Sequence, residues 1–251
     1  MLRLVSGLMF GIGDLLLIAA VVLAAAFLQT VSGFGFALFV VPLFGLFIDV
    51  KTGVVVSTLS GAVASTFHTV KDRNDINRPL ARRLIGASLV GMPCGLLILV
   101  AIPSEVLQVV VGFLVLVAAL LLVRRVVLPA ESRWVDRIAG FVSGVLATAT
   151  STNGPPLVVT LQAKQLSVAV FRPTVNSVFV VGAAVSIALY AMAGRIGWKE
   201  TSAALFALPG LMLGIVVGRA MRQKVTPRVF RSLVIILLVL TGVMSIAAGI
   251  A

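Results

Sequence analysis

Two short polar stretches interrupt apolar segments of this chain, and both contain residues that could bind an anion. The first lies within LQTVSGFGFALFVVP, residues 28–42, and the second within ATATSTNGPPLVVTL, residues 147–161. A helix that restarts after such a break presents unpaired N–H groups and a partial positive charge, which suit a negatively charged ligand. Glycine allows close backbone approach in the first break, and proline is favourable where the second helix restarts.

The candidate binding residues follow from these two breaks. Phe34 is preferred to Phe36 as a wall of the site because it lies between two glycines, although a phenylalanine that faces lipid or the core is the commoner case. The alternative is that both breaks are only kinks that allow tight helix packing. Their matching positions, about 120 residues apart, favour a binding role. The predicted site residues are Gln29, Thr30, Ser32, Gly33, Phe34, Gly35, Ser151, Thr152, Asn153, Gly154, Pro155 and Pro156.

Two more candidates, Arg172 and Asn176, lie in FRPTVNS after the second break. Arginine forms planar, bidentate contacts with oxyanions. The alternative for Arg172 is a topology anchor at the cytoplasmic mouth, and the alternative for Asn176 is a hydrogen bond between helices.

The elements that must position these residues are membrane helices. The 251 residues are 60% hydrophobic and only 11% charged, whereas soluble domains average about 25% charged residues. Mean hydropathy is +1.19. Alternating strands of the barrel kind are absent, so the sequence predicts an all-α, polytopic integral membrane protein. Ten apolar segments are expected at 12–31, 34–48, 52–70, 84–102, 105–123, 138–151, 154–163, 173–194, 201–218 and 230–251.

The charge distribution predicts the topology. Sixteen of the 20 basic residues lie in 71–83, 124–137 and 219–231 or at Lys164 and Arg172. These stretches are expected in the cytoplasm by the positive-inside rule, which also explains the net charge of +12 without nucleic acid. Both termini are then outside. Each broken pair becomes a hairpin that enters from one face and returns to it, either as a re-entrant loop or as two crossings.

Two inverted repeats follow from that topology, 1–128 and 129–251, each a broken-helix hairpin plus three crossing helices. GMPCGLLILV, from Gly91, resembles ALPGLMLGIVV, from Ala207, and a proline-started helix follows each. All eight acidic residues map to loops or segment ends, so no buried carboxylate relay is expected. No enzyme motif or metal-ligand cluster is present, and we expect neither an enzyme nor a metal or cofactor.

At VSGFGFALFVVPL, and at GPPLVV followed by FRPTVNS, the chain resembles the sulfite exporter TauE/SafE family of membrane permeases. The resemblance covers nearly the whole chain. It implies transport of small sulfur-containing anions such as sulfite and organosulfonates. It also places seven residues in the substrate region: Gly33, Phe34, Gly35, Asn153, Gly154, Pro155 and Pro156.

The functional hypothesis is therefore a secondary transporter in the inner (plasma) membrane that exports a small sulfur oxyanion by alternating access at the two breaks. Its expected partners are the anion and the lipid bilayer, and its exposed apolar surface would allow a homodimer. One alternative is a permease of the same fold that imports an anion or carries a different metabolite. Another is a membrane subunit that does not transport.

Overall fold

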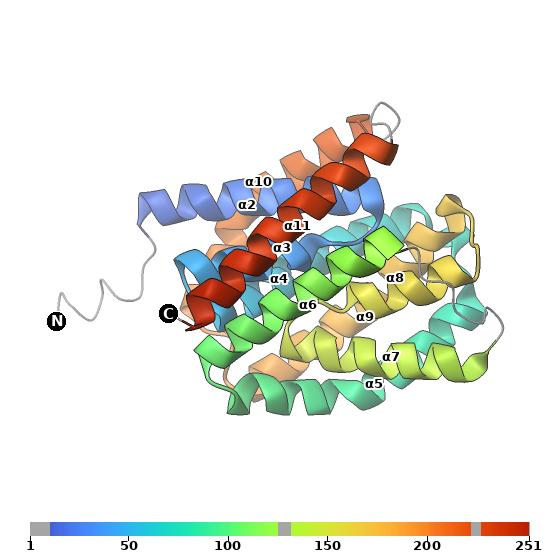
Figure 1. The fold of residues 1–251 in the computed structure, drawn as a ribbon, viewed down its shortest axis with the longest axis horizontal. Helices are drawn as coiled ribbons and strands as arrows, with labels where there is room; N and C mark the ends of the chain where they lie inside the picture. Colours follow the sequence, from blue (N-terminus) through green and yellow to red (C-terminus); the bar gives the residue numbers. More distant parts are fainter. Residues whose placement is uncertain (1–10, 125–131, 222–226, 251) are drawn as a thin grey trace.

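The computed structural model describes residues 11–124, 132–221 and 227–250, and within these ranges the regular structure is helical throughout (Figure 1). Each predicted apolar segment corresponds to one helix, which confirms the all-α polytopic class. The predicted boundary at 128/129 lies outside the described residues. The helices are α2 (Ile12–Ser32), α3 (Phe36–Phe47), α4 (Val50–Lys71), η1 (Arg73–Asp75), α5 (Arg78–Ala101), α6 (Ser104–Arg124), α7 (Arg133–Ala149), α8 (Gly154–Ala163), α9 (Val168–Met192), α10 (Trp198–Met221) and α11 (Pro227–Ile250).

Several helices begin earlier than the hydropathy pattern predicts. The side chain of Asn77 accepts a hydrogen bond from the Leu80 N–H (3.2 Å) and caps α5, which therefore starts six residues before the expected 84. Ser132 caps α7 in the same way, through the Val135 N–H at 3.4 Å. Hydropathy marks only the apolar part of a helix, whereas a polar cap can start the helix outside it.

Six of the described helices are long and apolar enough to cross a membrane: α2, α4, α5, α6, α9 and α10. The helices that follow the two breaks are much shorter. α3 has 12 residues and α8 has 10. At about 1.5 Å per residue they extend roughly 18 and 15 Å, about half of a hydrocarbon core of roughly 30 Å.

Glycines set the closest helix contacts. Gly91 and Gly95 of α5 lie against the backbone of α7, and Gly210 and Gly214 of α10 lie against the backbone of α2. Between α6 and α11, a Cβ at Gly112 would lie 2.7 Å from the carbonyl oxygen of Gly242. These approaches exclude any larger side chain, as expected where small residues repeat every fourth position in membrane helices.

The helix order repeats. α3 and α8 begin at residues 36 and 154, and α4 and α9 at 50 and 168, a spacing of 118 in both cases. The packing follows the same correspondence. α2 packs against α10 as α7 packs against α5, while α6 pairs with its counterpart α11 and α4 with its counterpart α9. The two predicted five-helix halves therefore also correspond in their neighbours.

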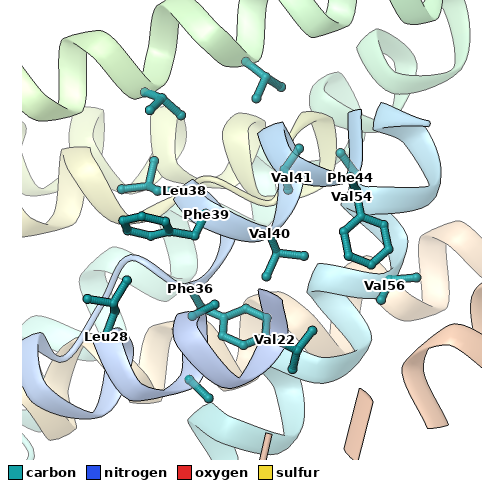
Figure 2. Packing of buried hydrophobic residues seen from close by; sticks show 14 of the residues in the cluster. Val22, Leu28, Phe36, Leu38, Phe39, Val40, Val41, Phe44, Val54 and Val56 are labelled. Atoms are coloured by element: carbon teal, nitrogen blue, oxygen red, sulfur yellow. The ribbon is translucent and has the colours of Figure 1, made fainter. Parts of the chain in front are cut away.

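The core lies around the first short helix. Figure 2 shows Phe36, Phe39, Val40 and Phe44 of α3 packed among side chains of neighbouring helices, including Val22 and Val54. All of these side chains are buried. A half-length helix is tolerated inside a bilayer only where protein surrounds it or water reaches it, and α3 meets the first condition.

The described residues of three basic stretches lie toward one end of the molecule, which we call the basic end. There Asp136 at the start of α7 pairs with Arg83 of α5 and with Lys164 after α8, both at 3.0 Å. The guanidinium of Arg219 at the end of α10 lies 5.3 Å from the ring of Phe67, near the end of α4. In Figure 1 these helix ends lie on the right, while α2 begins and α11 ends on the left.

Asp136 corrects one expectation. Its position is at a segment end, as predicted, but its side chain is only 1% exposed. The sequence pattern missed this burial because it depends on tertiary contacts. Arg83 of α5 and Lys164 after α8 approach the first turn of α7 and supply the charge partners. The buried carboxylate is therefore paired, as a buried charge must be.

Candidate functional site

A cavity of about 60 Å³ lies between the two breaks. That space is several times what one water molecule needs, about 10–15 Å³. Six helices or the turns beside them contribute to its wall, and every lining side chain is uncharged. The lining residues are Gln29, Gly35, Phe36, Ala37, Leu38, Ser57, Thr58, Gly61, Ser65, Ala147, Ser151, Thr152, Asn153, Gly154, Phe179, Ala183 and Ser186.

Both short helices start at this cavity. Gly35, at the N-cap of α3, has φ +100°, a left-handed conformation that favours glycine. No side chain caps α3, and the residues of its first turn, Phe36 to Leu38, line the cavity. The first N–H groups of a helix have no partner within the helix. Gly154, the first residue of α8, lines the same cavity. Two helix N-termini therefore converge on one uncharged, polar space.

The end of α2 is held by α9. Gly33 adopts φ +94° and its N–H donates to the Gln29 carbonyl at 2.6 Å, which closes the last turn. Nη2 of Arg172 donates to the Val31 carbonyl. Nδ2 of Asn176 donates to the Gly33 carbonyl at 3.2 Å. These donors satisfy carbonyls that a helix end leaves without partners.

Gln29 connects this helix end to the cavity. Its Nε2 donates to Oγ of Ser65 on α4 at 3.1 Å and to Oδ1 of Asn176 on α9 at 3.3 Å. Its Oε1 is buried and has no hydrogen-bond partner among the described residues. The amide therefore joins α2, α4 and α9 at the cavity wall.

The second break has its own polar connections. Ser151 has φ +58°, uncommon for a residue other than glycine. Its hydroxyl lies 3.1 Å from that of Thr58 and 3.3 Å from that of Ser57, both on α4. Thr150 and Thr152 hydrogen-bond to each other at 2.6 Å. The α4 hydroxyls thus contact the break of the other half at the cavity.

Tyr190, near the C-terminal end of α9, hydrogen-bonds to the end of α7. Its hydroxyl donates to the Thr148 carbonyl at 2.9 Å and lies 3.3 Å from the Ala147 carbonyl. Helix α9 therefore satisfies the C-terminal carbonyls of both broken helices, with Arg172 and Asn176 for α2 and Tyr190 for α7. The sequence pattern did not single out Tyr190, because the partners of its hydroxyl are backbone groups.

The structure brings only part of the predicted set to the cavity. Six predicted residues line it: Gln29, Gly35, Ser151, Thr152, Asn153 and Gly154. Eight lie outside its lining: Thr30, Ser32, Gly33, Phe34, Pro155, Pro156, Arg172 and Asn176.

Several of the residues outside the lining make contacts within or beside the first break. The Thr30 hydroxyl donates to the Ala26 carbonyl, and the Ser32 hydroxyl to the Leu28 carbonyl, both at 2.7 Å. Phe34 packs beside Gly154, whereas Phe36 reaches the cavity. The sequence favoured Phe34 over Phe36 as a wall of the cavity, but in the structure Phe36 lines it and Phe34 does not. Phe36 directly follows the turn formed by Gly33 and Gly35.

Two central helices supply cavity residues that the sequence reasoning missed. On α4 these are Ser57, Thr58, Gly61 and Ser65, and on α9 they are Phe179, Ala183 and Ser186. A signal for the first group exists. Small and polar residues recur every fourth position from 57 to 65, which places them on one helix face. Helix α4 also has the lowest mean hydropathy of the six spans, 1.3.

No metal or cofactor chemistry is indicated at the cavity. Within the described ranges, no group of three or more His, Cys, Asp or Glu residues could hold a metal ion. The chemistry available is hydrogen-bond donation by hydroxyls, amides and helix N–H groups.

Comparison with known proteins identifies the family of the chain. The model of the sulfite exporter TauE/SafE family matches residues 17–245, most of the chain. A curated relative, the probable inner membrane transporter protein TsaS of Comamonas testosteroni, is 33% identical over 110 residues. That alignment spans 43% of this chain and 46% of the relative, less than half of each. No solved structure gives a match. Both descriptions are of transport proteins, which confirms the expectation of a non-enzyme. The chain is a member of the sulfite exporter TauE/SafE family and an integral membrane protein.

Proposed function

We propose that this protein is a secondary transporter that binds a small sulfur-containing oxyanion in the cavity between the two breaks. The observation that carries the proposal is the uncapped N-terminus of α3, which opens on the same uncharged cavity as the start of α8. Helix N-termini favour anions because their N–H groups and dipoles point at the ligand. Family membership supports the substrate class.

The absence of a charged group in the cavity wall suits a transported ligand. Hydroxyls and amides can hold an oxyanion through several hydrogen bonds and still release it. A buried cation would bind it more tightly, because the attraction between opposite charges is strong in a site of low dielectric constant. The small cavity, about 60 Å³, favours an anion with few heavy atoms over a large organic one.

The arrangement of the short helices supports inverted repeats and alternating access. α8 ends beside Lys164, whose amine pairs with Asp136 at the basic end. α3 ends before Asp49, which accepts a hydrogen bond from Ser104 at 3.2 Å at the start of α6, the opposite end. The two half-helices thus leave the cavity toward opposite ends. Rocking one half against the other would open the cavity to each side in turn.

Export is the direction we propose. With the basic end in the cytoplasm, an inside-negative potential favours outward movement of an anion by about 2.3 kcal/mol per charge per 100 mV. An importer with the same fold, or a carrier of another metabolite, is distinguished by the sign of the flux and the identity of the substrate. A subunit without transport activity would show no flux.

The test is flux into proteoliposomes of purified protein, with sulfite, sulfate, thiosulfate and sulfoacetate as substrates. Gly61→Val places methyl groups in the cavity beside Phe36, whose ring atom Cδ1 would lie 3.5 Å from the new Cβ. We expect this variant to lose flux of at least one of the four anions. Gly13→Val, with nothing within 4 Å of its new Cβ, is the control and should retain it. Equal flux in both variants would remove the cavity from the pathway.

A further inference from the structure

A second concave site lies away from the transport cavity, on the outer surface where α5 and α7 pack together. This groove has a volume of about 440 Å³. Its lining residues are Arg82, Arg83, Gly86, Ala87 and Val90 of α5, with Arg137 and Phe141 of α7. Three guanidinium groups therefore stand at one end of the groove, and small or apolar residues form the rest.

We propose that this groove binds an anionic membrane phospholipid, with its phosphate at the three arginines and an acyl chain along the apolar part. The proposal does not depend on which substrate the cavity carries. Basic pockets between membrane helices, on the side where positive loops gather, are suited to acidic lipid headgroups.

The charge at the groove is positive on balance. Arg82 and Arg137 are exposed, while the Nε of Arg83 donates to Asp136 at 3.0 Å. Asp136 is also paired with Lys164, so the carboxylate does not cancel the arginines. The groove also lies near the N-termini of α5 and α7, which begin at Arg78 and Arg133. Helix N-termini add partial positive charge and favour a phosphate.

The apolar part of the groove matches an acyl chain rather than water. Val90 is 67% exposed and Phe141 is 40% exposed. A Cβ added at Gly86 would meet nothing within 4 Å, so this glycine leaves an open floor between the arginines and Val90. At the rim, the ring of Trp134 lies 5.2 Å from the guanidinium carbon of Arg137. Tryptophan beside arginine is typical of the membrane interface.

A free phosphate ion would use only the arginine end of the groove. The occupant that fits the whole surface is a lipid, because charge and apolar surface adjoin in one concavity on a helix face. An exposed arginine near an anionic lipid contributes about fivefold in affinity, so two arginines account for a factor of roughly 30.

The test is a thermal-shift titration of the full-length protein in detergent. The ligands are phosphatidylglycerol in mixed micelles, phosphatidylcholine as the neutral lipid, and inorganic phosphate as a headgroup without chains. We expect stabilisation by phosphatidylglycerol alone. Arg82→Gln/Arg137→Gln should weaken the apparent affinity roughly 30-fold. Gly86→Leu should also weaken it, by filling the floor without changing charge.

Two matched variants serve as controls. Arg73→Gln/Arg219→Gln removes two exposed arginines at the same end but outside the groove, and Gly13→Leu adds the same side chain at another helical glycine with open space. Both should respond to phosphatidylglycerol as the unmodified protein does. Equal weakening in the two arginine pairs would overturn the proposal in favour of diffuse attraction to the basic end. Stabilisation by inorganic phosphate, or an unchanged response in Gly86→Leu, would also overturn a lipid site.

Discussion

Arg172 illustrates how a single side chain can support a binding site without entering it. Its guanidinium donates to the Val31 carbonyl at the end of α2, and its Cγ would lie 2.7 Å from a Cβ at Gly33. A cation at a helix C-terminus opposes the partial negative charge there. The sequence left open whether Arg172 contacts an anion or anchors the topology. In the structure its guanidinium contacts the backbone of the first break.

The first prediction concerns the stability that Arg172 provides. Arg172→Met removes a charged donor from a backbone acceptor, and hydrogen bonds to charged groups contribute about 1.5–3 kcal/mol. We expect a lower melting temperature in detergent, with partial recovery in Arg172→Lys because the lysine ammonium keeps the charge. Unchanged stability together with lost substrate binding would instead make Arg172 a ligand of the anion.

Gly33 is a poor position at which to test the candidate site by substitution. Its φ of +94° and its contact with Arg172 mean that any side chain there strains the backbone and displaces a neighbour. Loss of binding in a Gly33 variant would therefore not distinguish a disrupted fold from a disrupted site. Gly154 is more informative, because an added Cβ would make only ordinary contacts, the nearest 3.6 Å from Phe34.

At the scale of elements, Asp136 joins three helices of the basic end. Its carboxylate pairs with Arg83 from α5 and with Lys164 from the end of α8. Removing one partner from a buried ion pair costs about 3–5 kcal/mol. The cost here should be smaller, since the Arg83 side chain is 37% exposed.

The second prediction tests this connection. Asp136→Asn should lower the melting temperature, and adding Lys164→Gln should recover part of the loss, because it removes one of the two cations left facing each other. Asp75→Asn, an exposed acid of η1, is the matched control and should have little effect. Flux per folded protein should survive in all three. If Asp136→Asn abolished flux at normal stability, Asp136 would belong to the transport cycle as a relay.

The order and type of the helices could be predicted from the sequence because apolar length decides what crosses a bilayer. The breaks could be predicted because glycine and proline mark them. The polar face of α4 carries a sequence signal, but the sequence does not show which space that face, or Ser186 of α9, turns toward. Only the packing of α4 against α9 turns their faces to the cavity. The burial of Asp136 is also a property of the assembly of three helices.

At the scale of the whole molecule, basic side chains are concentrated toward one end. The basic end carries Arg83, Lys164 and Arg219, as described above. At the opposite end Asp49 caps α4 by accepting from the Thr52 N–H at 2.8 Å. The hydroxyl of Thr52 lies 3.4 Å from Oε1 of Glu200. The described residues of the predicted basic stretches lie toward the basic end, which we expect in the cytoplasm by the positive-inside rule.

The last prediction tests that orientation by cysteine labelling in intact cells. Cys94, which is exposed, is first replaced by alanine. Single cysteines are then placed at four positions near helix ends: Asn74 and Ser132 at the basic end, and Glu105 and Gly197 at the other. A membrane-impermeant reagent added outside should label 105 and 197 but not 74 and 132, and permeabilised cells should label all four. Labelling of 74 from outside would invert the topology, and with it the proposed outward direction of anion movement under an inside-negative potential.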